Sequence, residues 1–185
     1  MLGLIEDVEK HTMTPALKSE GDILIYTGAD REGLGATEYL KVIHGLTEGD
    51  SPVLDIDFEV KLQKSVLSAI QNRLITAAHD ISDGGLSITL AEMCMFGKMG
   101  ATIDLSEIGG NKYETFFSEA QSGIVITTSH SNLDQVMTHF QNDEVPAYII
   151  GEAGGYDLMI SGLDPIEISE MERIYSSVIS NAMKD

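Results

Sequence analysis

Short apolar runs with strand composition alternate with amphipathic helical patterns along this chain of 185 residues, and no other feature limits its fold more. Strands are expected at 3–8, 22–28, 75–79, 101–105, 123–128, 147–151 and 156–161. Helices are expected at 37–45, 55–74, 85–96, 131–140 and 169–183. The order is not a strict strand–helix–strand repeat. It therefore predicts an α/β (α+β layered) domain, with a mixed β-sheet packed by helices.

Several polar residues stand where helices are expected to begin or end. The expected N-caps are Thr37, Asp55 or Asp57, and Ser131. Gly45 is expected to stop the first of these helices. Arg73 is expected in the last turn of the helix over 55–74, where a cation interacts favourably with the helix dipole.

The charge of the chain excludes some classes of partner. Eleven Lys and Arg residues against thirty Asp and Glu residues give a net charge of −19. Such a field repels nucleic acid and anionic membranes, and an anionic ligand needs backbone amides or Mg²⁺ to offset it. The acidity is also explained by solubility alone. No apolar run approaches about 18 residues and no secretory leader is recognisable, so the sequence predicts a cytoplasmic protein without a membrane span.

The single cysteine and most of the histidines offer little chemistry. Cys94 is the only cysteine, so no internal disulfide is possible, and it follows Leu86 and Leu90 at helical spacing. A buried core thiol is therefore expected. His44, His130 and His139 lack the spacing of metal ligands.

The stretch AHDISDGGL, residues 78–86, has the composition of a ligand-binding turn between a strand and a helix. Its glycines allow the backbone to approach a ligand closely, and the first amides of the following helix lack intrahelical partners. These amides favour an anion such as phosphate. Asp80 and Asp83 are suited to Mg²⁺, which commonly bridges one or two carboxylates to phosphate oxygens.

A structural interpretation of the same stretch remains open. Ser82 or Asp83 is then the helix cap, Asp80 accepts hydrogen bonds from turn amides, and His79 is a hydrogen-bonded histidine at a strand end. The stretch is neither a P-loop nor a dinucleotide fingerprint. The glycine-rich loop over 28–38 also precedes a helix, but an ordinary loop is the favoured interpretation there, and 118–123 is interpreted as a polar turn.

The residues HDISDGGL, followed by the helical pattern LxxxLAEM, resemble the ATP-dependent synthetase superfamily that includes aminoimidazole ribonucleotide (AIR) synthetase, selenophosphate synthetase and thiamine-monophosphate kinase. Further segments narrow the resemblance to the synthetase subunit of the phosphoribosylformylglycinamidine (FGAM) synthase family. They are GLIEDV, EGDILIYTG, LGATEYLKVIHG, DIDFEVKLQ, FFSEAQSG and VPAYIIGEAGG.

The resemblance implies a C-terminal fragment of a much longer enzyme. Members of that family contain two tandem copies of an A and a B domain. Residues 21–185 look like the second B domain, with an AIR synthetase C-terminal-domain-like fold of partial ferredoxin-like topology. Residues 1–20 look like the end of the preceding A domain and a linker.

The family reaction is the ATP-dependent amidation of formylglycinamide ribonucleotide (FGAR) with glutamine-derived ammonia, in purine biosynthesis. The resemblance implies ATP and Mg²⁺ as cofactors of the full-length enzyme and none required by the fragment. The implied partners are the remainder of the synthetase chain, a glutaminase subunit and a small accessory subunit. The fragment alone is expected to be inactive, and to form a homodimer if surfaces normally covered by the A domain are left open.

The resemblance assigns no catalytic residue to this chain, because the catalytic histidine of the family lies in the A domains. Internal pseudo-symmetry instead implies an auxiliary phosphate or nucleotide site, with Asp80 as its metal ligand. Its residues are His79, Asp80, Ser82, Asp83, Gly84, Gly85, Ser118, Glu119 and Gln121. The chain departs from many relatives at Ala120, where they have serine, and at Ala36 and Thr37, where Gly-Ser is common. The alternative functions are a stand-alone phosphate- or nucleotide-binding module and a structural assembly domain.

Overall fold

A seven-stranded sheet forms the framework of the computed structural model, which describes residues 4–108 and 111–183. Its strands are β1 (Ile23–Gly28), β2 (Ala77–Asp80), β3 (Ala101–Ile103), β4 (Gly123–Thr128), β5 (Ala147–Ala153), β6 (Asp157–Ile160) and β7 (Ile166–Glu167). Their order is β2-β4-β1-β5-β3-β6-β7. Every neighbouring pair is antiparallel except β3 and β6, which are parallel, so the predicted mixed sheet is confirmed.

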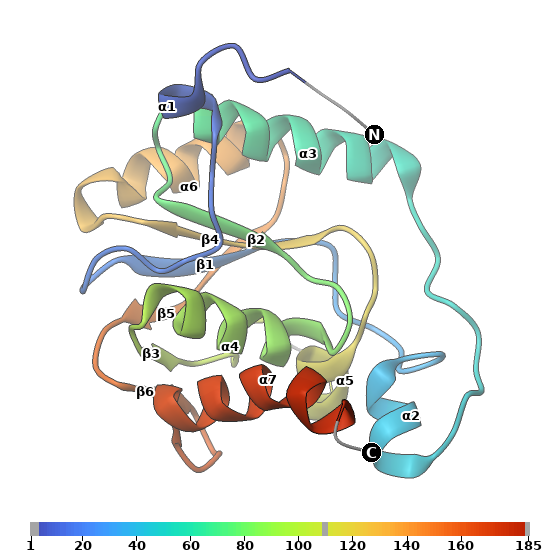
Figure 1. Ribbon diagram of the computed structural model, residues 1–185. Helices are drawn as coiled ribbons and strands as arrows, with labels where there is room; N and C mark the ends of the chain where they lie inside the picture. Colours follow the sequence, from blue (N-terminus) through green and yellow to red (C-terminus); the bar gives the residue numbers. More distant parts are fainter. Residues whose placement is uncertain (1–3, 109–110, 184–185) are drawn as a thin grey trace.

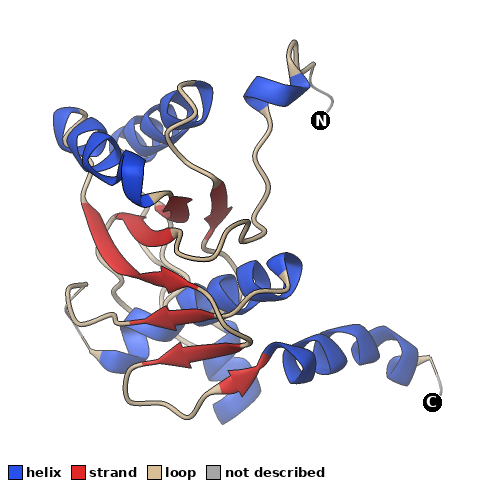
Figure 2. Ribbon diagram, turned by 90° about the vertical axis from the view of Figure 1, so that its left-hand side faces the viewer, coloured by secondary structure: helices blue, strands red, loops and turns tan. Residues whose placement is uncertain are grey.

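Helices cover both faces of this sheet. The helices are α1 (Val8–His11), α2 (Glu38–His44), α3 (Ile56–Gln71), α4 (Gly85–Gly97), α5 (Lys112–Phe117), α6 (Leu133–Asn142) and α7 (Ile168–Ala182), with a 3₁₀ turn η1 at His130–Asn132. Helices α3 and α6 lie on one side of the sheet and α4 and α7 on the other (Figure 1). Figure 2 shows α7 extending away from the sheet edge toward the C-terminal end of the chain.

Strand β1 lies inside the sheet, between β4 and β5, and its alternating side chains supply both hydrophobic cores. Leu24 and Tyr26 point into the core formed with α4 and α7, and Ile23 and Ile25 point into the core formed with α3 and α6. All six residues of β1 are buried. Burying one such apolar side chain stabilises a fold by about 1.5–3 kcal/mol, so this strand accounts for much of the cohesion between the layers.

Three of the expected helix ends are confirmed. The Thr37 hydroxyl accepts a hydrogen bond from the Leu40 amide at 3.4 Å, and the Asp55 carboxylate accepts one from the Phe58 amide at 3.0 Å. Gly45 ends α2 in the left-handed conformation, with φ 66°. Cys94 is buried, as expected, and burial raises the pKa of its thiol to about 12.

Three local predictions are wrong. Within 3–8, residues 4–7 form no strand, and α1 begins at Val8 behind an Asp7 cap; residue 3 lies outside the described residues. Arg73 lies beyond the end of α3 in a left-handed conformation, φ 57°, so it is not in the last helical turn. Ser131 does not cap α6, because its hydroxyl is paired with that of Ser129 inside the 3₁₀ turn.

The C-terminal part differs from expectation in its pairing. Residues Glu152 and Ala153, expected in a turn, belong to β5, and β3 lies between β5 and β6. Helix α5 was not expected from the sequence. Helix α7 has the expected extent, but beyond the buried Met171 its apolar side chains are exposed. These exposed side chains are Ile174, Tyr175, Val178, Ile179 and Met183.

Candidate functional site

Three segments that are distant in the sequence meet at the carboxylate of Glu119. We call residues 79–85 the elbow, since they join β2 to α4. The Glu119 Oε1 atom accepts a hydrogen bond from the Gly84 amide in the elbow at 2.8 Å. The same atom accepts one from the Glu38 amide, at the start of α2, also at 2.8 Å. The structure thus brings the glycine-rich loop, the elbow and the 118–122 segment together.

Two glycines give the elbow its shape. Gly84 and Gly85 have φ values of 82° and 71°, in the left-handed region that disfavours side chains. A Cβ atom on Gly85 would lie 2.7 Å from the Phe116 carbonyl oxygen and 2.8 Å from Phe117 Cα. Glycine therefore allows the start of α4 to lie directly against the end of α5.

The structural interpretation of the stretch was wrong about the cap of α4. Gly84 is the N-cap residue, and neither Ser82 nor Asp83 makes a side-chain capping bond; Ser82 supplies only its carbonyl oxygen, to the Gly85 amide at 3.0 Å. The carboxylate that accepts from the N-cap amide of α4, at Gly84, comes from Glu119 instead. An internal anion therefore already lies where the sequence suggested an external phosphate.

A buried arginine holds the segment that carries Glu119. Arg31 is 3% exposed, and its guanidinium donates to the carbonyl oxygens of Ser118 and Ala120. The hydroxyl of the buried Ser118 donates to the Glu32 carbonyl at 3.0 Å. Burial lowers the pKa of Arg31 and raises that of the adjacent Tyr26 to about 12. Arg31 thus fixes the backbone on both sides of Glu119. This role of Arg31 was not predicted from the sequence.

His79 is tied to the helix that follows the elbow. Its Nε2 atom lies 2.9 Å from Glu92 Oε2 on α4, and its Nδ1 atom lies 3.3 Å from Asp80 Oδ1. The His79 side chain is only 14% exposed, whereas that of Asp80 is 75% exposed. The histidine thus has the environment of a structural residue, as the structural interpretation of the stretch expected, and the aspartate faces solvent.

The remaining site residues form an exposed, acidic rim around the elbow. Ser82, Asp83 and Gln121 are exposed, like Asp80. Among the described ranges 4–108 and 111–183, no three His, Cys, Asp or Glu side chains are grouped as a metal site. A cation bound by Asp80 must therefore take most of its ligands from water or from a bound phosphate.

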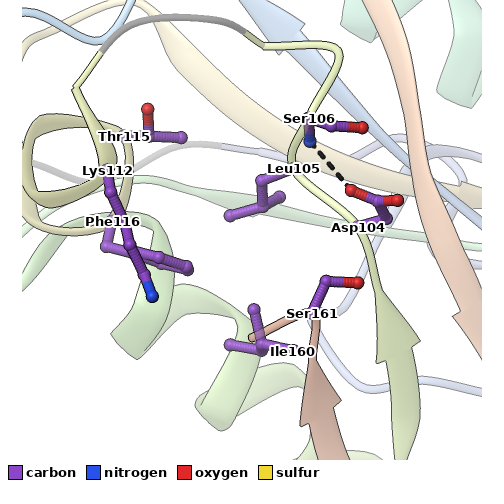
Figure 3. Close-up of a pocket in the computed structure, with 8 residues that line it drawn as sticks. All are labelled: Asp104, Leu105, Ser106, Lys112, Thr115, Phe116, Ile160 and Ser161. Carbon is purple, nitrogen blue, oxygen red and sulfur yellow. Dashed lines mark hydrogen bonds between the residues drawn. The ribbon is translucent and has the colours of Figure 1, made fainter. Parts of the chain in front are cut away.

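A separate hollow of about 330 Å³ lies beyond the carboxyl ends of the parallel strands β3 and β6, next to α5. Leu105, Phe116 and Ile160 line it, and Figure 3 shows Lys112 and Asp104 on opposite sides. The Ser106 amide donates to Asp104 at 2.9 Å and holds the pKa of that carboxyl below its usual value. The Lys112 ammonium donates to the Gly162 carbonyl at 3.4 Å, so both charged groups already have partners.

Comparison with protein families decides the relationship. A family described as "AIR synthase related protein, C-terminal domain" matches residues 19–159. The chain belongs to this family. The predicted relationship to AIR synthetase-related C-terminal domains is therefore confirmed. Separately, none of the helices in the described ranges is long and apolar enough to cross a membrane.

Curated relatives are phosphoribosylformylglycinamidine synthase subunits named PurL. The chain is 35% identical to that of Alkaliphilus metalliredigens over 188 residues, which covers all of this chain and 25% of the relative. It is 40% identical to that of Caldanaerobacter subterraneus subsp. tengcongensis over 160 residues, or 86% of this chain and 22% of the relative. The chain thus spans about a quarter of the length of the curated relatives that it matches.

Solved structures agree on the fold. PurL of Thermotoga maritima, complexed with FGAR, superposes with a TM-score of 0.73 at 16% identity, over 86% of this chain and 29% of that one. HypE of E. coli, a hydrogenase maturation protein, gives a TM-score of 0.57 at 17% identity, over 84% and 50%. The TM-scores support a shared architecture.

Proposed function

We propose that this chain is the C-terminal domain of an FGAM synthase, the ligase that amidates FGAR at the expense of ATP in purine biosynthesis. The observation that carries the proposal is the 35% identity to a PurL subunit over the whole chain, within only 25% of that relative. In this assignment residues 21–185 are the second B domain, and residues 1–20 are the end of the preceding A domain and a linker. The proposed location of the enzyme is the cytoplasm.

The domain contributes structure to the synthetase and performs no chemistry alone. Its catalytic groups and the main ATP and Mg²⁺ site belong to the rest of the enzyme. The T. maritima PurL structures complexed with FGAR or with ATP support this assignment by their shared fold. The chain itself offers an internally capped elbow and a buried arginine, and both position backbone segments.

A chimera tests this assignment. The segment of the A. metalliredigens PurL subunit that matches this chain is replaced by residues 1–185, and ATP-dependent formation of FGAM is measured with ammonia as the nitrogen donor. We expect activity in the chimera, none in a variant that lacks the segment, and none in the isolated chain. A folded chimera without activity, beside an active parent, would contradict the proposal.

The elbow is proposed as an auxiliary phosphate or nucleotide site of that enzyme. The residues are His79, Asp80, Ser82, Asp83, Gly84, Gly85, Ser118, Glu119 and Gln121, with Asp80 as the metal ligand. Because Glu119 already occupies the Gly84 amide and the rim is acidic, a phosphate is expected to bind there only together with Mg²⁺. The exposure of the Asp80 carboxylate supports its role as the cation ligand.

Calorimetric titration with ADP and ATP, each with and without Mg²⁺, tests the auxiliary site. We expect heat only when Mg²⁺ is present, and its loss in Asp80→Ala. Asp134→Ala, which removes an exposed acid on α6, serves as the matched control. The absence of heat with the intact chain, or equal binding by Asp80→Ala, would leave the elbow a structural joint.

The exposed apolar side of α7 is proposed to contact the remainder of the synthetase. Ile174, Tyr175 and Val178 are each more than half exposed. A patch of this kind marks an interaction surface, and in the isolated chain it favours a homodimer. A glutaminase and a small accessory subunit complete the proposed complex. A structure described as PurLQS from T. maritima supports an assembly of PurL with further components. Val178→Lys should reduce self-association in sedimentation, whereas Ser176→Lys should leave it unchanged.

A further inference from the structure

Residues 32–54 form a segment that stands apart from the sheet, and we call it the flap. It contains α2, which has no buried residue. In Figure 1 α2 lies at the edge of the molecule, and long connections lead to it from β1 and from it to α3. Val42 and Ile43 are 71% and 63% exposed. The two cores of the domain therefore do not hold this segment in place.

The flap is closed on itself at its base. The Ala36 amide donates to the Glu48 carbonyl at 3.0 Å. A Cβ atom on Gly35 would lie 2.3 Å from the Asp50 carbonyl oxygen, so the two chain segments are in direct backbone contact. Since its two ends are joined in this way, the flap is able to move as one unit.

Besides the bond from the Ser118 hydroxyl to the Glu32 carbonyl and a tilted ring contact of Tyr39 with Tyr113, two contacts attach the flap to the domain near the elbow. The Tyr39 ring stacks on Phe117 at the end of α5, with ring centroids 4.5 Å apart and an interplanar angle of 12°. The Glu38 amide donates to Glu119. The first contact is a stacked aromatic pair, and the second is a hydrogen bond to a charged group, which is stronger than one between neutral groups.

The second contact is shared with the elbow through a single oxygen atom. Amides at a helix start have no intrahelical acceptor, so the Glu38 and Gly84 amides each depend on Glu119 Oε1. A carboxylate is also favoured at the positive ends of both helices. Arg31 donates to the carbonyl oxygens on either side of Glu119, so the backbone that carries this shared acceptor is anchored in the domain.

We propose that Glu119 is a latch that couples closure of the flap to the order of the elbow. With the latch in place, the flap covers the Phe117 ring and the elbow amide is capped. When the carboxylate leaves, both helix starts lose their acceptor in the same event. Such a coupling is reciprocal, so loosening the flap from its far side loosens the elbow as well. This inference goes beyond the proposed function and requires no bound ligand.

Backbone amide exchange, followed by NMR on the 185-residue chain without nucleotide, tests the latch. The Glu38 and Gly84 amides are the two probes, because helix-start amides are normally unprotected. We expect both to be protected in the native chain and to exchange at least about tenfold faster in Glu119→Ala. Glu107→Ala, which removes an exposed acid away from the elbow, should leave both rates unchanged.

A second variant distinguishes coupling from two independent caps. Tyr39→Ala removes the aromatic stack without touching the elbow, and the latch predicts faster exchange at Gly84 as well as at Glu38. Acceleration at Glu38 alone would overturn the proposal, as would a Glu119→Ala variant in which only one probe responds. If Glu119→Ala unfolds, Glu119→Gln decides: it keeps a weaker oxygen acceptor, and both probes should accelerate together to a smaller extent.

Discussion

The imidazole Nε2 of His79 lies 2.9 Å from the Glu92 carboxylate, and this contact ties the edge strand β2 to the middle of α4. The ring is largely buried, so removing its partner leaves a polar nitrogen without a hydrogen bond. We expect Glu92→Ala to lower the free energy of unfolding by about 1–3 kcal/mol in urea titrations. Glu170→Ala, which breaks only an exposed pair with Arg173, should cost less than about 1 kcal/mol. Equal losses of unfolding free energy in the two variants would mean that the His79–Glu92 contact adds no more stability than an exposed ion pair.

Gly85 and Gly33 offer a matched test of close packing at the elbow. Both have left-handed backbones, with φ values of 71° and 79°. A Cβ atom at Gly33 meets nothing within 4 Å, whereas one at Gly85 meets the backbone of α5. We expect Gly33→Ala to cost about 1–2 kcal/mol from backbone strain alone, and Gly85→Ala to cost clearly more. Thermal unfolding of both variants measures the difference, and similar losses would contradict the packing described for the elbow.

Arg31 should prove one of the least replaceable residues outside the hydrophobic cores. Arg31→Met removes the donors to the Ser118 and Ala120 carbonyls and leaves these buried groups unpaired. We expect a loss of about 2–4 kcal/mol in denaturant titrations, with partial retention in Arg31→Lys. Arg173→Met on the exposed side of α7 is the control and should change stability little.

Ala36 carries strain that glycine would relieve. Its φ of 59° lies in the left-handed region, which favours glycine. We expect Ala36→Gly to stabilise the chain by up to about 1 kcal/mol, or roughly 2–4 °C in melting temperature. Ala29→Gly, at a loop residue without a positive φ, should not stabilise. A lower melting temperature for Ala36→Gly would contradict the strain.

Alkaline pH should destabilise the chain through Cys94. Burial raises its pKa from 9.0 to about 12, so the unfolded thiol ionises first as pH rises. The contribution of the neutral Cys94 thiol to the free energy of unfolding is therefore complete below pH 9. It is lost between pH 9 and 12, by at most about 1.4 kcal/mol per pH unit. We expect Cys94→Ala to show a smaller loss between pH 9 and 10.5 in urea titrations. An unchanged pH dependence would exclude the thiol as its source.

The elements that sequence analysis predicted are those whose causes are local. The apolar run of β1 and the spaced apolar residues and Asp55 cap of α3 lie within single segments, and both elements are found. Helix α5 has six residues and is held by Phe116 packing against the core, so its sequence alone gives little helical signal. The Ser131 cap failed because a 3₁₀ turn, stabilised by the Ser129 hydroxyl, comes before α6.

The candidate site was predicted as a set of residues but not as an arrangement. The elbow and the 118–122 segment do meet, yet Glu119 is joined to amides that are 81 and 35 residues away. No local spacing indicates such a contact. Ser82 and Asp83 were predicted as alternative caps because of their residue types, but the left-handed glycines that follow direct the chain so that neither side chain serves α4. Nothing near Arg31 in the sequence marks it as buried.

Strand β1 is synthesised well before the two strands with which it pairs. Its two partners in the sheet, β4 and β5, begin at Gly123 and Ala147, so an emerging polypeptide carries this strand without either neighbour until most of the domain has left the ribosome. Pairings between such distant segments make folding slow. A strand whose residues are all buried is thus synthesised before its neighbours and paired late, and chaperone binding or early aggregation should begin at this segment.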